Sequence, residues 1–464
     1  MVFSSPVFLF VFLPFVWFFH ALLPEKLRKA FLLFVSLVFY MYGEAWFVLL
    51  MLATILTAHV SIVLIGRCKR LKTTIAATGS ILALAVLFVF KYANFFTSQL
   101  APLFALFSVN ITPTQFHLPL GISFFTFQAV SCIMDFYRKG SEKQPHFIDT
   151  ALYISFFPQL VAGPIVRYDN FIPQLKYRAV HYAAFLYGLK RFIYGFAKKV
   201  LISNNVAPIV DKLYSIEPSS IGTAEAWASV FIFGLQLYFD FSGYSDMAIG
   251  LARMFGIRIP ENFRYPYAAT SMRDFWHRWH ISLSTWFRDY LYIPLGGSRK
   301  GDMRTILNIW VVFSVCGLWH GAAWNFILFG ALSAFLLTIE RLYSRHIAFK
   351  NAFLARFYVF IVVFPAFFCS FRSNSVMQFL YMIRAMFIPL SSSTDFLQLF
   401  DAKSLFVIAA GAVSGFPVYQ IITNKFSSYK IFRYFEAVFL TLLFAAALSS
   451  SSMIFSDPFI YFRF

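Results

Sequence analysis

Residues 311–330 read VVFSVCGLWHGAAWNFILFG, an almost wholly apolar stretch with one histidine, His320, in its middle. Burying the polar nitrogens of an imidazole at membrane depth costs several kcal/mol unless they find partners. An ionisable residue in such a stretch therefore indicates a functional site. Imidazole is also the side chain best suited to take up and return a proton near neutral pH. We predict a membrane enzyme built around His320.

The composition of the whole chain also indicates an integral membrane protein. Of the 464 residues, 60% are hydrophobic and 13% are charged, whereas soluble domains carry about 25% charged residues. Apolar runs follow one another along the chain, and its length allows roughly ten to twelve membrane-spanning helices. We predict an all-α polytopic protein in which shorter runs are re-entrant or interfacial. The first run has no basic segment before it, so we expect a retained span rather than a cleaved signal.

The formal charge of +19 does not indicate nucleic-acid binding. The cations gather in short clusters between apolar runs, at 25–29 and 67–72 for example, which is the positive-inside pattern of membrane proteins. Anionic lipid head groups are the expected counter-charges. We place these loops on the cytoplasmic side of the plasma (inner) membrane. With no internal repeat or linker, residues 1–464 are predicted to form a single domain.

Asp274, His277 and His280 follow one another at intervals of three residues and could suggest a metal site. On a helix, however, the first and the last of them lie about 240° apart, so they cannot face one ion unless the helix breaks. The chain also has no His-Glu-x-x-His motif and no zinc-like cysteine spacing. We therefore expect no metal.

Three other polar side chains lie in apolar surroundings. Cys316 precedes His320 by one helical turn and could act as a nucleophile, although cysteine is common in apolar helices as a small hydrophobe. Asp240 and Asp246 lie in the apolar run 226–252. A buried carboxylate needs a partner, and we favour a structural tie to an arginine or tryptophan over direct catalysis.

The last ten residues, 455–464, read FSDPFIYFRF. Pro458 ends any preceding helix, and Tyr461 follows in a short aromatic tail. Because Tyr and Arg favour the membrane interface, the tail could be an interfacial anchor. The alternative is that it folds back into the protein and offers the Tyr461 hydroxyl to His320.

Five stretches in this order and spacing resemble the membrane-bound O-acyltransferase family, and especially its bacterial branch of alginate and peptidoglycan O-acetylation and teichoic-acid D-alanylation proteins. They are SFFPQLVAGPI at 155–165, the run Tyr238–Asp246, PENF at 260–263, residues 275–297 and residues 317–325. The resemblance extends from about residue 118 to 345, which we take as the catalytic core. It implies a ring of tilted helices around a thinned centre, where funnels from the two sides meet.

The resemblance also implies roles for single residues. The near-invariant histidine of the family corresponds to His320 and its second characteristic histidine to His280, whereas the family does not usually have a histidine at the position of His277. The tail is similar to an ending whose tyrosine is thought to carry the acyl group, here Tyr461. Supporting or cavity-lining positions are Trp279, Trp319, Asn325, Asp240 and Asp246.

These implications lead to a mechanistic hypothesis. A cytoplasmic thioester, with acetyl-CoA as the expected donor, places its acyl group near His320, which acts as general base on an attacking hydroxyl. If that hydroxyl belongs to Tyr461, the product is an aryl ester, which remains activated because a phenol has a pKa of about 10. His280 would orient His320 or polarise the thioester carbonyl, and the tryptophans would exclude water. The basic inner face could attract the phosphates of the donor.

The acyl group would then reach an envelope glycan such as peptidoglycan or an alginate-like polymer, directly or through an extracytoplasmic SGNH-type acetyltransferase. Membrane lipids are expected partners. We expect no bound cofactor and no nucleic acid. Two other classes of protein stay open. A proton-coupled transporter would also bury Asp and His within many spans, and a scaffold could recruit a soluble transferase.

Overall fold

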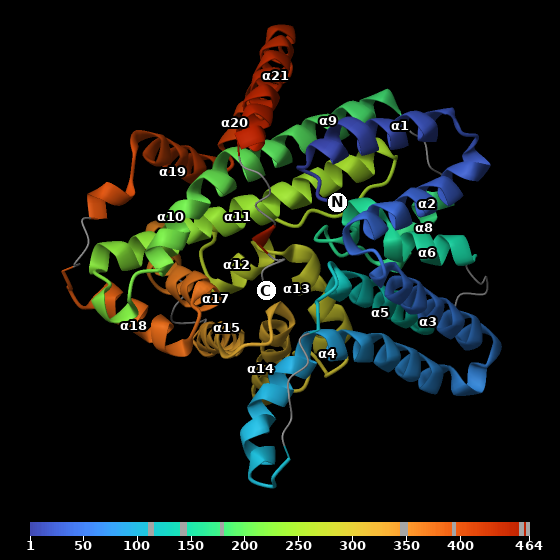
Figure 1. Cartoon of the computed structure of the whole chain (residues 1–464), viewed down its shortest axis with the longest axis horizontal. Coiled ribbons are helices and arrows are strands. Elements are labelled where there is room, and N and C mark those ends of the chain that lie inside the picture. Colours follow the sequence, from blue (N-terminus) through green and yellow to red (C-terminus); the bar gives the residue numbers. More distant parts are fainter. Residues whose placement is uncertain are drawn as a thin grey trace. The chain divides into compact units, whose positions relative to one another are not determined.

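The computed structural model describes residues 1–109, 116–139, 146–176, 181–343, 351–391, 396–453 and 459–460 (Figure 1). Within these ranges the regular structure is helical and contains no strand, as the all-α prediction requires. The chain divides into two compact units, Met1–Phe192 with Met247–Pro260, and Ile193–Asp246 with Glu261–Phe464. The single domain expected from the sequence stays a prediction.

The first unit contains the N-terminal helices, whose bounds follow signals in the sequence. Pro24 immediately precedes α2, and the basic residue Arg67 closes α3, as proline and cations favour helix starts and ends. Helices α3, α4 and α5 pack against one another. The bounds are η1 Phe8–Phe12, α1 Leu13–Leu22, α2 Glu25–Glu44, α3 Phe47–Arg67, η2 Lys69–Leu71, α4 Lys72–Ala105, α5 Ile122–Lys139, α6 Phe147–Ser155, α7 Phe157–Leu160, α8 Tyr168–Lys176 and α9 Tyr182–Ala197, whose last residues belong to the second unit.

The second unit contains the two histidines of interest. Its helices are η3 Lys198–Ser203, α10 Asn204–Tyr214, η4 Pro218–Ser220, α11 Thr223–Met254 (which ends in the first unit), η5 Pro266–Ala268, α12 Met272–Arg278, α13 Ile281–Phe287, η6 Arg288–Tyr292, α14 Asp302–His320, α15 Trp324–Leu342, α16 Ala352–Tyr358, η7 Val359–Val363, η8 Pro365–Cys369, α17 Ser370–Arg372, α18 Val376–Phe387, η9 Phe396–Leu399, α19 Ala402–Ser414, α20 Val418–Phe426 and α21 Lys430–Met453.

Among the described residues, five helices are long and apolar enough to cross a membrane: Phe47–Arg67, Lys69–Ala105, Trp324–Leu342, Ala352–Arg372 and Lys430–Ser451. The pair α19 and α20, bent by 61°, would make a sixth. These are fewer than the roughly ten to twelve spans predicted from the sequence. Several apolar runs form shorter pieces, and others lie in helices such as α11 and α14 that are long but not apolar enough. The run 148–163 is divided between α6 and α7, and the run 376–390 forms α18, a helix of 12 residues.

Candidate active site

His320 is the last residue of α14, and glycines hold this helix close to α15. A Cβ added at Gly317 would lie 2.3 Å from the carbonyl oxygen of Phe326, and one at Gly330 would lie 2.3 Å from the carbonyl oxygen of Phe313. Small residues allow two helix backbones to approach in this way. The close packing fixes the end of α14, and with it the position of His320.

The imidazole of His320 is surrounded by aromatic rings. The residue is 3% exposed. Its ring centroid lies 4.8 Å from that of Trp319, 5.3 Å from that of Phe329 and 5.2 Å from that of Phe371. All three contacts are edge-on, which is a favourable geometry for aromatic pairs. The histidine therefore faces the protein interior.

His280 lies between α12 and α13 in a left-handed backbone conformation, with φ 43° and ψ 53°. This conformation is unfavourable for a residue other than glycine and is often found at functional sites. His280 is fully buried. Its ring contacts Phe241 at 4.6 Å and Trp319 at 5.9 Å. Because Trp319 also contacts His320, it joins the two predicted catalytic histidines in one cluster.

Asn262 holds His280 and determines which of its nitrogens carries the proton. The Asn262 Oδ1 atom accepts hydrogen bonds from the backbone N–H of Ser282 at 3.2 Å and from its hydroxyl at 2.9 Å. A backbone N–H can only donate, so this amide atom is the oxygen. It lies 3.1 Å from His280 Nδ1, which must therefore be the donor, and the lone pair of a neutral imidazole then lies on Nε2.

His280 lies outside the helices that are long and apolar enough to cross a membrane. Burial lowers its pKa to about 3, because an imidazolium loses its hydration in a low-dielectric interior. His280 is therefore neutral at physiological pH. Asn262 was not among the site residues predicted from the sequence, although it lies in the family-like stretch at 260–263.

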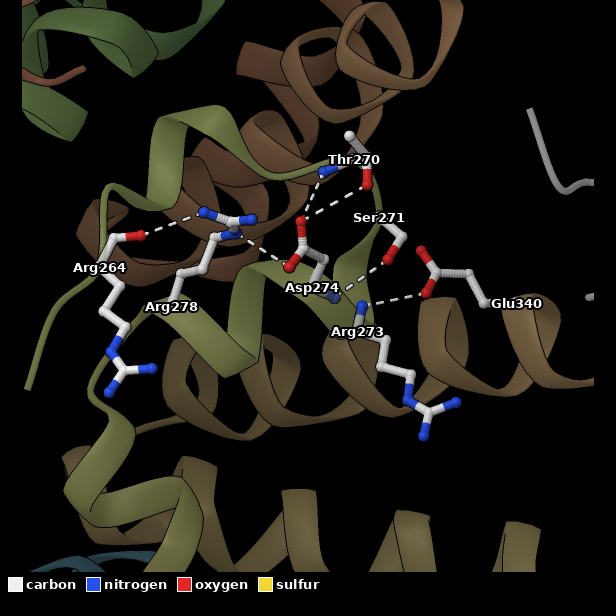
Figure 2. A network of polar contacts seen from close by, with 7 residues as sticks. All are labelled: Arg264, Thr270, Ser271, Arg273, Asp274, Arg278 and Glu340. Atoms are coloured by element: carbon white, nitrogen blue, oxygen red, sulfur yellow. Dashed lines mark hydrogen bonds and ion pairs between the residues drawn. The ribbon is translucent and has the colours of Figure 1, made fainter. Parts of the chain in front are cut away.

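A polar network fixes α12, the helix that leads into His280 (Figure 2). The side chain of Ser271 accepts from the backbone N–H of Asp274 at 3.0 Å and caps the helix. Glu340 of α15 accepts from the N–H of Met272 at 2.5 Å and from that of Arg273 at 3.0 Å. These bonds satisfy backbone donors that the first turn of a helix cannot use, and a carboxylate there also complements the helix dipole.

The two acidic residues of α11 are paired with consecutive lysines. Asp240 Oδ1 lies 2.6 Å from Lys199 Nζ, and Asp246 Oδ2 lies 2.6 Å from Lys198 Nζ. A structural tie to an arginine or tryptophan was expected for both carboxylates, and the ion pairs of both are made with lysines. Both lysines belong to the π-helical turn η3.

Residues 459 and 460 contact the same helix. The backbone N–H of Ile460 donates to Asp240 Oδ2 at 2.7 Å. The ring of Phe459 lies 5.5 Å from that of Phe241 and 5.0 Å from that of Tyr244. Figure 1 shows residues 459–460 in dark red beside α11. Tyr461, the predicted acyl carrier, lies outside the described residues.

The structure places the remaining candidates as follows. Trp279 is buried and packs against Phe275 at 5.6 Å and Phe367 at 5.4 Å. Asn325 is buried in the first turn of α15, and Cys316 is buried in α14.

The helix that carries Asp274, His277 and His280 does break, at His280. His277 is nevertheless exposed while His280 is buried. In the part of the chain that the structure describes, no three His, Cys, Asp or Glu side chains are grouped closely enough to hold a metal ion.

A model of the membrane-bound O-acyltransferase family matches residues 73–383, a range that contains Asn262, His280 and His320. The chain belongs to the membrane-bound O-acyltransferase family. It is therefore an O-acyltransferase and a multi-pass membrane protein. The match ends before the C-terminal tail.

Three relatives agree with this membership. Over 346 residues the chain is 42% identical to a probable alginate O-acetylase AlgI of Azotobacter vinelandii, covering 74% of this chain and 69% of the relative. It is 35% identical over 378 residues to a peptidoglycan O-acetyltransferase of Helicobacter pylori, covering 74% and 71%. It is 34% identical over 238 residues to a teichoic acid D-alanyltransferase of Bacillus subtilis, covering 49% and 60%.

Proposed function

We propose that this membrane-bound O-acyltransferase takes an acyl group from a cytoplasmic thioester such as acetyl-CoA, and that this group is acetyl. It passes the group across the plasma (inner) membrane for O-acetylation of an envelope glycan. The observation that carries the proposal is the buried cluster of His280, Trp319 and His320 within the family-matched region. An imidazole held among aromatic rings can move a proton while water is excluded, which protects an activated acyl group from hydrolysis.

In the first step, His320 accepts the proton of the Tyr461 hydroxyl as the phenolic oxygen attacks the thioester carbonyl. The bond between the acyl carbon and oxygen forms, and the bond between the acyl carbon and sulfur breaks. His320 then returns the proton to the leaving thiolate, so no net proton is consumed. Support for this step comes from the tail, since the residue preceding Tyr461 is held by Asp240 next to an aromatic neighbour of His280.

The geometry favours one of the two roles expected for His280. Polarising a thioester carbonyl needs a hydrogen-bond donor, and the Nδ1 donor of His280 is directed to Asn262. The other nitrogen of a neutral imidazole carries a lone pair and can only accept. We therefore assign His280 a role in orienting His320 or the attacking hydroxyl by accepting a hydrogen bond.

In the second step, a hydroxyl of the acceptor attacks the aryl ester and releases the Tyr461 phenol, which regains its proton. This step is downhill because a phenol is a better leaving group than a sugar alcohol. The names of the relatives favour alginate-like polymers or peptidoglycan as the final acceptor. An SGNH-type acetyltransferase on the outer side is the expected partner for this transfer.

The test uses the purified full chain in detergent or liposomes with radiolabelled acetyl-CoA. We expect His320→Ala to abolish thioester cleavage while the protein remains folded, whereas the exposed His146→Ala retains it. A transporter would show no thioester cleavage in the parent protein. Tyr461→Phe separates relay from direct transfer, because normal glycan acetylation by this variant would exclude the relay.

A further inference from the structure

Ile460 is bonded to α11 through its backbone N–H. We propose that Asp240, Phe241 and Tyr244 of α11, together with Lys199, form a docking site for residues 459–460, which we call the tail socket. Phe459 is 3% exposed and Ile460 is 5% exposed, so both side chains are covered by the protein.

The carboxylate of Asp240 divides its two oxygens between a lysine and the tail. Oδ1 is paired with Lys199 at 2.6 Å and Oδ2 accepts the Ile460 N–H at 2.7 Å. Asp240 is 1% exposed. A buried carboxylate is tolerated only when it is paired and hydrogen-bonded. The lysine neutralises the charge, and the tail supplies a hydrogen bond to the other oxygen.

Two features of the socket distinguish the tail from any other extended segment. Asp240 binds the backbone N–H of residue 460, so this hydrogen bond does not depend on the side chain at that position. The ring at position 459 packs against two aromatic residues, Phe241 at 5.5 Å and Tyr244 at 5.0 Å. The socket therefore selects an aromatic residue followed by a residue with a backbone N–H, which excludes proline at position 460.

The socket connects the tail to the histidine cluster. Phe241 contacts both the ring of Phe459 and, at 4.6 Å, the ring of His280. Asp240 is therefore a positioning residue, which holds the main chain of Ile460 while the preceding Phe459 packs against an aromatic neighbour of His280. This consequence for transfer rests on the proposed function, whereas docking of the tail does not.

Docking is tested by the reactivity of a thiol introduced into the tail. In the full chain, Ile460→Cys is combined with Cys68→Ser, because Cys68 is exposed while Cys132, Cys316 and Cys369 are buried. We expect slow labelling by N-ethylmaleimide. Adding Asp240→Ala should raise the labelling rate about tenfold to a hundredfold, the factor expected for losing one hydrogen bond to a charged acceptor.

Two further variants keep the test decisive. Since Asp240→Ala leaves Lys199 buried without its carboxylate, the pair is also replaced as Asp240→Leu with Lys199→Met, which removes both charges and is compatible with folding. This double variant should release the tail equally. Asp246→Ala removes a neighbouring carboxylate that pairs with Lys198 and should leave labelling slow. The tail socket is refuted if the folded double variant is labelled slowly. It is also refuted if the introduced thiol is labelled fast while Asp240 is intact.

Acyl transfer by the same variants reports on the proposed function separately. If release of the tail lowers transfer at least tenfold, the socket positions the reacting end of the chain. If labelling shows release but transfer continues at the parent rate, docking stands and the Tyr461 relay is wrong.

Discussion

Replacing Asn262 by aspartate should give the enzyme a new acid limb in its pH profile. The substitution keeps an oxygen for the three hydrogen bonds that Asn262 Oδ1 accepts from His280 and Ser282. The remaining contact, from Asn262 Nδ2 to Ser245 Oγ at 3.1 Å, can reverse because a hydroxyl can also donate. The main change is therefore a negative charge next to the imidazole.

The size of the effect follows from the distance. Asn262 Oδ1 lies 3.1 Å from His280 Nδ1. Opposite charges about 4 Å apart attract by about 4 kcal/mol at an effective dielectric constant of about 20, which corresponds to about three pH units. Burial lowers the pKa of His280 to about 3 in the parent protein. In Asn262→Asp it should rise to about 6.

The sign of the pH effect is fixed by the role of His280. A raised pKa means that His280 is protonated below about pH 6, where it loses the lone pair with which it accepts a hydrogen bond. Acyl transfer by Asn262→Asp should therefore fall as the pH decreases from about 7 to about 5. The parent protein should lose no activity through His280 in this range, because its pKa lies far below it.

The assay is thioester cleavage by the purified protein between about pH 5 and 8, the range in which histidine chemistry is usually followed. Asn170→Asp, which adds the same charge at an exposed position of the first unit, is the matched control and should leave the profile unchanged. The reasoning is refuted if Asn262→Asp is folded and its pH profile is the same as that of the parent protein. In that case either Asn262 does not set the protonation of His280, or the reaction does not need His280 to be neutral.

Three further variants test contacts within the second unit through thermal unfolding in detergent. Gly317→Ala places a Cβ 2.3 Å from the Phe326 carbonyl oxygen and should lower the free energy of unfolding by about 1–3 kcal/mol, whereas Val315→Ala on the exposed face of α14 should change it by less than about 0.5 kcal/mol. Trp227→Phe removes an indole N–H that donates to the carbonyl oxygen of Met386 at 3.0 Å. The buried indole N–H of Trp276 has no acceptor among the described residues. Trp227→Phe should therefore lower the free energy of unfolding by about 1 kcal/mol more than Trp276→Phe, and equal losses would contradict this. Glu340→Gln weakens the two bonds at the start of α12 and should cost about 1–2 kcal/mol and reduce transfer, while the exposed Glu217→Gln serves as control.

The sequence alone established the class of the protein and its helical architecture, and it predicted His320 as the central residue. These follow from local properties. Apolar runs form helices wherever they occur, and a histidine in an apolar stretch stands out without knowledge of its neighbours. The motif at 275–297 also predicted a role for His280 through its similarity to the family.

The partners of these residues were decided only by the tertiary structure. Asn262 precedes His280 by 18 positions, and Asp240 is bonded to Ile460 across 220 positions. No periodicity in the sequence relates residues so far apart. The sequence predicted that Asp240 needs a partner, because a buried carboxylate is costly. Which side chain reaches it depends on how η3 packs against α11, and this choice, a lysine and the end of the chain, exists only in the folded protein.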